Sequence, residues 1–116
     1  MSAREPQAGT SDIAMVTVSE WLVCHNSGDD VIVLSCTVST ADGSSKITSA
    51  GLILNDAKGN TLAASYTAFS DSITAFPSIN LPPGSLSVGD TVNAVVQGEC
   101  DQHHYFFEEE LTITNC

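Results

Sequence analysis

From Ile13 onward the chain consists of short apolar stretches separated by residues that favour turns. Within several stretches apolar and polar residues alternate, which is typical of strands with one face in a hydrophobic core. Stretches rich in Leu, Glu and Lys, which favour helices, are rare. The pattern therefore predicts about seven strands, at 13–24, 31–38, 47–54, 61–69, 73–76, 91–100 and 105–114.

Turn signals occur every 8–14 residues, including the Asn- and Gly-containing segments 25–29 and 55–60. Strands at this spacing predict an all-β fold, an antiparallel β-sandwich of immunoglobulin-like size with Greek-key connections. An eight-stranded jelly roll or a small barrel is the alternative. We expect residues 1–11 to form a flexible tail and residues 12–116 to form a single β-sandwich domain.

Composition excludes several classes of partner. The 116 residues include 14 acidic and three basic side chains, a formal net charge of −11. Nucleic-acid phosphates require clustered Lys and Arg, whereas Arg4, Lys46 and Lys58 are scattered, so we expect no nucleic-acid partner. Anionic membrane surfaces are disfavoured for the same reason. No apolar stretch approaches the roughly 18 residues of a membrane span, so we expect no membrane insertion.

Four cysteines in a short chain predict two disulfides and an oxidising compartment. Cys36 and Cys100 lie in phase with the apolar faces of their strands, near ends that a sandwich places at one edge. We therefore predict a Cys36–Cys100 bridge through the core and a Cys24–Cys116 bridge between the first and last strands. The spacing is not that of a zinc finger, although Cys24-His25 and His103-His104 leave a metal site as an alternative.

The predicted Cys36–Cys100 bridge resembles the cross-sheet bridge of immunoglobulin domains. The likeness extends to architecture only, because Trp21 precedes the first bridge cysteine and Gly98 stands where a tyrosine corner would place Tyr. The first nine residues lack the apolar core of a signal peptide. Because of the cysteines, we interpret the sequence as a mature secreted chain with an added Met.

The segment from Asp101 to Phe107 carries two His residues and three aromatic residues, in a chain with few aromatics. It is interpreted either as a binding loop or as a solvated turn whose Tyr105 and Phe107 enter the core. Alternation leaves Phe106 pointing outward under both interpretations. The outward candidates for contacting a partner are Trp21, Phe69, His103, His104 and Phe106.

The acidic residues have two interpretations. Glu108 and Glu110 share one face of the last strand and could hold a cation or act as an acid–base pair. Edge protection by charge is the favoured interpretation. The acidic turns at Asp29-Asp30, Asp42, Asn55-Asp56 and Asp71 could supply calcium ligands, but turn formation explains them better.

We expect a secreted, non-enzymatic recognition protein that binds a protein or glycan partner through loops or a sheet face. Neither a nucleophile elbow nor a glycine-rich phosphate loop is present, and we expect no cofactor. The alternative is a structural, self-assembling subunit: a homo-oligomer, a capsid decoration protein, or a fibre or surface-layer component. A metal-assisted hydrolase using His103, His104, Glu108 and Glu110 is a third hypothesis. We also expect stronger self-association near the pI of about 4.1, where charge repulsion vanishes.

Overall fold

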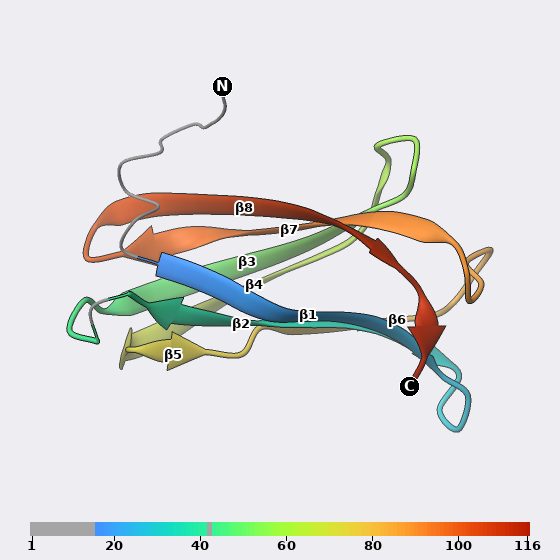
Figure 1. Ribbon diagram of the computed structural model, residues 1–116, viewed down its shortest axis with the longest axis horizontal. Coiled ribbons are helices and arrows are strands. Elements are labelled where there is room, and N and C mark those ends of the chain that lie inside the picture. The colour runs from blue at the N-terminus through green and yellow to red at the C-terminus, as the bar shows by residue number, and fades with distance from the viewer. Residues whose placement is uncertain (1–15, 42) are drawn as a thin grey trace.

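The computed structural model describes residues 16–41 and 43–116, which form two stacked β-sheets (Figure 1). Sheet A contains β1 (Val16–Asn26), β2 (Val31–Thr40), β5 (Thr74–Ala75), β6 (Ser78–Leu81) and β9 (Thr114–Asn115). Sheet B contains β3 (Ile47–Asn55), β4 (Thr61–Ser72), β7 (Thr91–Cys100) and β8 (His103–Thr112). The predicted all-β, two-sheet architecture is confirmed. The predicted tail at 1–11 lies outside the described residues.

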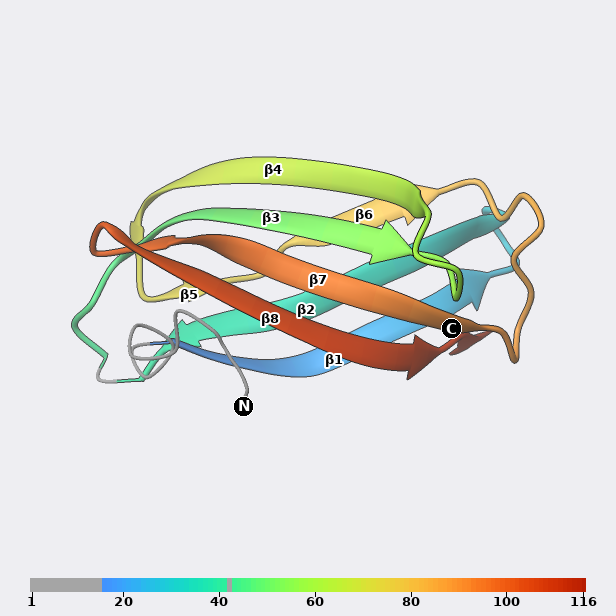
Figure 2. The ribbon, with the colours of Figure 1, turned by 90° about the horizontal axis from the view of Figure 1, so that it is seen from above.

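Sheet B has the strand order β4-β3-β7-β8, and its strands pair antiparallel throughout. In sheet A, β2 pairs with β5, β6 and β1, and β1 pairs in parallel with β9. Figure 2 shows β4 on the same long side of the sandwich as β5 and β6, and β8 on the side of β1. The two edges of sheet B therefore face opposite sides of the molecule.

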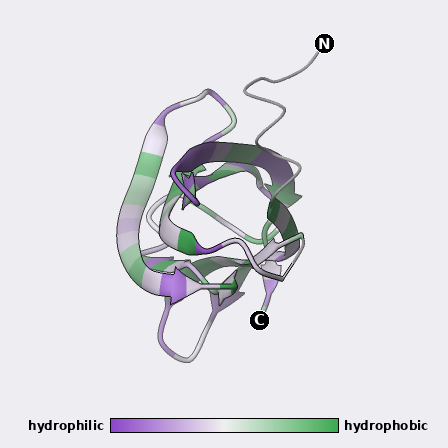
Figure 3. Ribbon diagram, turned by 90° about the vertical axis from the view of Figure 1, so that its left-hand side faces the viewer, coloured by the Kyte–Doolittle hydropathy of each residue, from purple (hydrophilic) through white to green (hydrophobic). Residues whose placement is uncertain are grey.

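The core lies between the sheets and is built by alternation. Ile32, Leu34 and Val38 of β2 and Leu52 and Leu54 of β3 belong to one hydrophobic cluster, and all five are essentially buried. Hydrophobic and hydrophilic bands both occur on the strands that surround the core in the end-on view of Figure 3. Complete burial of one such side chain contributes about 1.5–3 kcal/mol to folding. The alternation predicted for 31–38 is therefore confirmed at the positions of β2 that contribute most to stability.

Several strand assignments differ from the sequence prediction. The strand predicted at 105–114 ends at Thr112, and Thr114–Asn115 forms the separate strand β9, which joins sheet A by pairing in parallel with β1. Ser78–Leu81, which lies outside the predicted strands, is strand β6 and pairs with Ile32–Ser35 of β2. β8 begins at His103 rather than Tyr105, because only Asp101 and Gln102 form the turn, with φ of 48° and 68°. Positive φ at both central residues is the geometry of a tight two-residue hairpin, so His103 and His104 lie on a strand instead of a loop.

The predicted Cys24–Cys116 disulfide is confirmed. Its Cα atoms lie 5.0 Å apart, and it links β1 to the residue that follows β9 across 92 positions of sequence. Closing so long a loop restricts the unfolded chain and contributes about 4.6 kcal/mol if the effect is purely one of chain entropy. The bridge indicates an oxidising, non-cytoplasmic environment. Within the described ranges no helix has the length and apolarity to cross a membrane.

The predicted Cys36–Cys100 bridge is wrong. Both cysteines face the core, as their phase predicted, but they remain buried thiols. Cys36 lies in the middle of β2, which runs on to Thr40, whereas Cys100 ends β7 opposite Ile47. The prediction assumed that both cysteines lie at strand ends on the same edge of the sandwich, and only Cys100 does lie at a strand end. Burial raises the pKa of the Cys36 thiol to about 12, which keeps it protonated and unreactive.

Candidate functional site

The outer face of sheet B consists of side chains aligned in rows across the four strands. One row runs from Tyr66 on β4 through Gly51 on β3 and Gln97 on β7 to Phe106 on β8. The row beside it ends with Glu99 and His104, which are direct partners on β7 and β8. Adjacent strands lie about 4.8 Å apart, so the backbones bearing the two aromatic residues are separated by about 14 Å.

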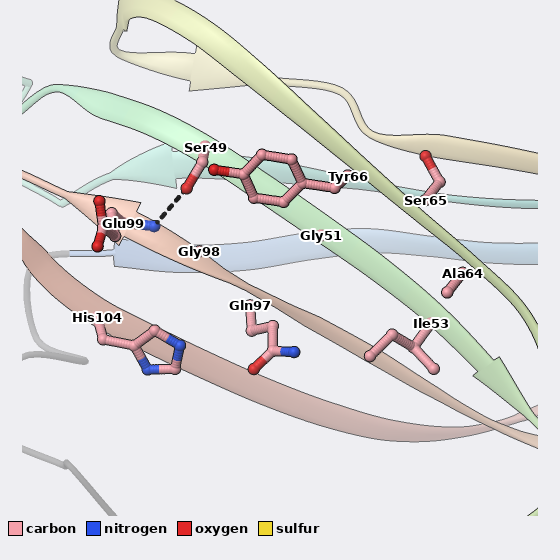
Figure 4. Close-up of a pocket in the computed structure, with 10 residues that line it drawn as sticks. All are labelled: Ser49, Gly51, Ile53, Ala64, Ser65, Tyr66, Gln97, Gly98, Glu99 and His104. Atoms are coloured by element: carbon pink, nitrogen blue, oxygen red, sulfur yellow. Dashed lines mark hydrogen bonds between the residues drawn. The ribbon is translucent and has the colours of Figure 1, made fainter.

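A groove of about 520 Å³ lies over these rows. This volume is in the range of small-molecule binding sites. The residues that form it belong to β3, β4, β7 and β8 (Figure 4). The groove is lined by Ser49, Gly51, Ile53, Ala64, Ser65, Tyr66, Gln97, Gly98, Glu99 and His104.

The groove is deep because small residues, including Gly51 and Gly98, form its floor. A Cβ at position 51 would lie 3.7 Å from Tyr66 Cδ1. Because Gly51 has no side chain, the Tyr66 ring can lie close to the backbone of β3. In Figure 4 this ring extends from β4 across β3, toward Ser49. Tyr66 is nevertheless 71% exposed, which leaves the aromatic surface open to solvent. An exposed ring supported by the sheet is a platform for stacking.

Polar groups stand at the opposite side of the groove. Gln97, Glu99 and His104 offer an amide, a carboxylate and an imidazole, which together donate and accept hydrogen bonds. Ser49 Oγ accepts a 3.0 Å hydrogen bond from the backbone N–H of Glu99, which fixes the position of the Ser49 side chain between β3 and β7. Of the two lysines in the described residues, neither Lys46 nor Lys58 lines the groove, and Glu99 adds a carboxylate to it.

Glu108 extends the acidic character of this face along β8. Its carboxylate accepts a hydrogen bond from the Asn93 side-chain amide on the neighbouring strand. β8 is an edge strand, as the edge-protection interpretation of Glu108–Glu110 requires. His103 and His104 point to opposite faces of β8 because neighbouring residues of a strand alternate. Among the described residues, no three His, Cys, Asp or Glu side chains gather as a metal site would require.

Two of the five residues predicted to contact a partner belong to this face. His104 lines the groove, and Phe106, which is 45% exposed, lies beside Gln97 at the end of the central row. His103 is exposed at the start of β8. Trp21 and Phe69 are half-buried and pack against the core. The contact role of all five remains a prediction.

Sequence reasoning missed Tyr66, Gly51 and Gln97. Alternation within each strand places these residues outward, but it does not say which strands are neighbours. Pairing of β3 with both β4 and β7 brings residues 51, 66 and 97 into one row. An outward Tyr in a strand made mostly of small residues was the available signal.

The acidic turns are explained by local hydrogen bonds. Asp56 Oδ1 accepts from the backbone N–H groups of Lys58 and Asn60, each at 2.9 Å, and the Asn60 bonds are the main reason that the pKa of Asp56 is lowered. Asp30 contacts His25 Nε2 at 3.0 Å. These contacts close the hairpins, as turn formation predicted. Asp42 lies outside the described residues.

The fold is similar to parts of two solved structures. A DUF3823 family protein from Bacteroides ovatus matches 96% of this chain with a TM-score of 0.56 and 14% sequence identity. A β-glucuronidase from Parabacteroides merdae matches 85% of this chain with a TM-score of 0.57 and 10% identity. The matches span 58% of the first protein and 14% of the second.

At these identities the likeness defines the class of fold and nothing finer: the chain is a β-sandwich similar to one found within larger proteins. No protein-family model matches the sequence, and no curated protein is detectably similar to it.

Proposed function

We propose that this protein is a secreted, non-enzymatic carbohydrate-binding β-sandwich, and that the outer face of sheet B holds a neutral oligosaccharide. The observation that carries the proposal is the row in which Tyr66 and Phe106 stand on either side of Gly51 and Gln97. A low floor between two exposed aromatic residues accommodates a ligand that lies across the strands.

The chemistry of the lining groups favours a sugar chain over other ligands. The C–H groups on one face of a pyranose carry partial positive charge and are attracted to the negative face of an aromatic ring such as Tyr66. Gln97, Glu99 and His104 supply donors and acceptors for hydroxyl groups. The Glu99 carboxylate disfavours anionic sugars and nucleic acids, and so does the absence of Lys and Arg from the groove lining within the described residues.

The arrangement of the lining groups supports binding without catalysis. The Ser49 hydroxyl is engaged with a backbone N–H rather than with a base that would activate it. The Cys24–Cys116 bridge supports secretion. The pairing of β3 with β7 in one sheet and of β2 with β6 in the other supports an immunoglobulin-like Greek key.

The test is calorimetric titration with neutral hexasaccharides of glucose, xylose, mannose and galactose, together with an array that also carries anionic glycans. We expect at least one neutral chain to bind with a Kd of roughly 10 µM to 1 mM. Tyr66→Ala and Phe106→Ala should each weaken binding about tenfold, because each removes a stacking surface.

Phe76→Ala is the matched control, since Phe76 is 70% exposed but lies next to strands of sheet A, outside both the groove and the row that ends at Phe106. Its affinity should equal that of the unaltered protein. A second variant, Gly51→Val, fills the floor from a position where a Cβ meets only ordinary contacts of 3.5–3.7 Å. It should abolish binding while the protein remains folded. The proposal would be overturned if no neutral glycan bound, or if Tyr66→Ala left the dissociation constant unchanged.

A further inference from the structure

The two edges of sheet B differ sharply in charge. β8 carries Glu108, Glu109 and Glu110 in its second half. β4, at the other edge, spans 12 residues and has one charged side chain, Asp71, next to its end. An exposed strand edge presents unpaired backbone N–H and C=O groups, and proteins usually place charge on it to prevent pairing with another chain. Only one edge of this sheet is protected in this way.

Exposed apolar side chains gather on the side of the unprotected edge. Of the large hydrophobic residues that are exposed in the described ranges, Leu62 and Tyr66 belong to β4, and Ile73 and Phe76 follow it. β4 and β5 lie along the same side of the sandwich in Figure 2. Tyr66 and Phe76 are about 70% exposed, so this side retains much of its apolar surface in contact with water.

We infer that β4 pairs antiparallel with β4 of a second copy of this chain, which joins the two B sheets into one continuous eight-stranded sheet. A two-fold axis places the same strand on both sides of the interface, so the surface must be compatible with itself. β4 meets this condition because it is nearly uncharged, in a chain of net charge −11. A strand of 12 residues offers about 40 Å of backbone for pairing.

This inference goes beyond carbohydrate binding and does not depend on it. In the dimer the outer faces of the two B sheets become one surface, with the two Tyr66 side chains near its centre. Two grooves would then lie on the same face of the assembly, an arrangement that favours bivalent attachment to a polymer.

The test is sedimentation equilibrium of the full chain, without glycan, from about 1 to about 200 µM. We expect a concentration-dependent species of twice the 12.1 kDa mass of one chain. Dimerisation should strengthen with added salt, because salt screens the repulsion between two acidic chains. A strict monomer over the whole range would overturn the inference, whatever the glycan experiments show.

Thr67→Lys locates the interface. Thr67 lies near the middle of β4, so two-fold pairing brings the two lysines close to one another, and their repulsion should raise the dimer dissociation constant at least about tenfold. Thr112→Lys, on the opposite edge strand β8, makes the same change in charge and should leave dimerisation unchanged. A dimer that resists Thr67→Lys but is lost in Thr112→Lys would place the interface elsewhere and contradict the inference.

Hydrogen exchange gives a second measurement that needs no variant. Amides of β4 should become more protected as protein concentration rises, whereas amides of β8 should not. Equal protection of β4 at low and high concentration, in a sample that dimerises, would exclude strand pairing as the cause.

Discussion

The hydroxyl group of Tyr105 donates a 2.7 Å hydrogen bond to the backbone carbonyl of Ser49, two strands away in sheet B. The ring reaches Ser49 beneath the intervening strand β7, at Gly98. A Cβ at position 98 would overlap the Ser49 carbonyl oxygen and lie 2.7 Å from the Tyr105 hydroxyl. Gly98 therefore makes room for a contact that holds β3, β7 and β8 together below the groove.

Tyr105→Phe should reduce the free energy of unfolding by about 1–2 kcal/mol, because it leaves a buried carbonyl without its side-chain partner. Urea unfolding followed by fluorescence of Trp21 measures this change. Tyr66→Phe is the control: its hydroxyl is exposed, so stability should change by less than about 0.5 kcal/mol. Equal losses in both variants would show that the Ser49 contact contributes nothing.

Gly98→Ala should destabilise the protein by about 3 kcal/mol, because the added methyl group must displace a backbone carbonyl or the Tyr105 ring. Gly51→Ala adds the same atom in the same sheet, where the nearest atom is 3.5 Å away. It should therefore be close to neutral. Thermal unfolding of the pair compares them directly, and a Gly98→Ala protein as stable as Gly51→Ala would contradict the described packing.

Alkylation followed by mass spectrometry should distinguish the cysteines. The native protein should take up no iodoacetamide, because Cys36 and Cys100 are buried and burial raises the pKa of Cys36 to about 12. Unfolding without reductant should expose two thiols, and unfolding with reductant should expose four, since Cys24–Cys116 is then broken. A protein that gains no label on unfolding would contain a second disulfide.

Stability should fall at high pH because of Tyr105. Its burial, reinforced by the nearby thiols of Cys36 and Cys100, raises the pKa of the Tyr105 phenol. The unfolded chain loses this proton near pH 10, whereas the folded chain retains it. The contribution to stability is therefore complete below about pH 10 and is lost as the pH rises toward the folded value.

Tyr66→Phe leaves Tyr105 as the remaining tyrosine, so the absorbance of tyrosinate reports on it alone. The folded variant should ionise above pH 10, and the variant unfolded in urea near pH 10. Identical titration curves for the two states would show that Tyr105 is not buried.

Several features of this protein follow from local pattern. Alternation along 31–38 and 91–100 depends only on which neighbours share a face of a strand, so it predicted the core-facing residues of β2 and β7. It did not predict Val95, which is buried on the other face of β7. The Cys24–Cys116 bridge followed from the ends of the first and last strands. Phe106 was predicted to point outward, and it does.

The remaining features depend on which strands lie side by side and where each begins. β6 forms because Ser78–Leu81 finds β2 as a partner, and Cys36 and Cys100 remain thiols because they do not meet at matching strand ends. The groove likewise requires Gly51 to stand between Tyr66 and Gln97, which only the pairing of β3 with β4 and β7 decides. The sequence alone determined a β-rich, acidic, disulfide-bonded chain, because these properties are local or compositional. Tertiary structure decided the candidate site and the unprotected edge, because hydrogen bonding between distant strands sets both.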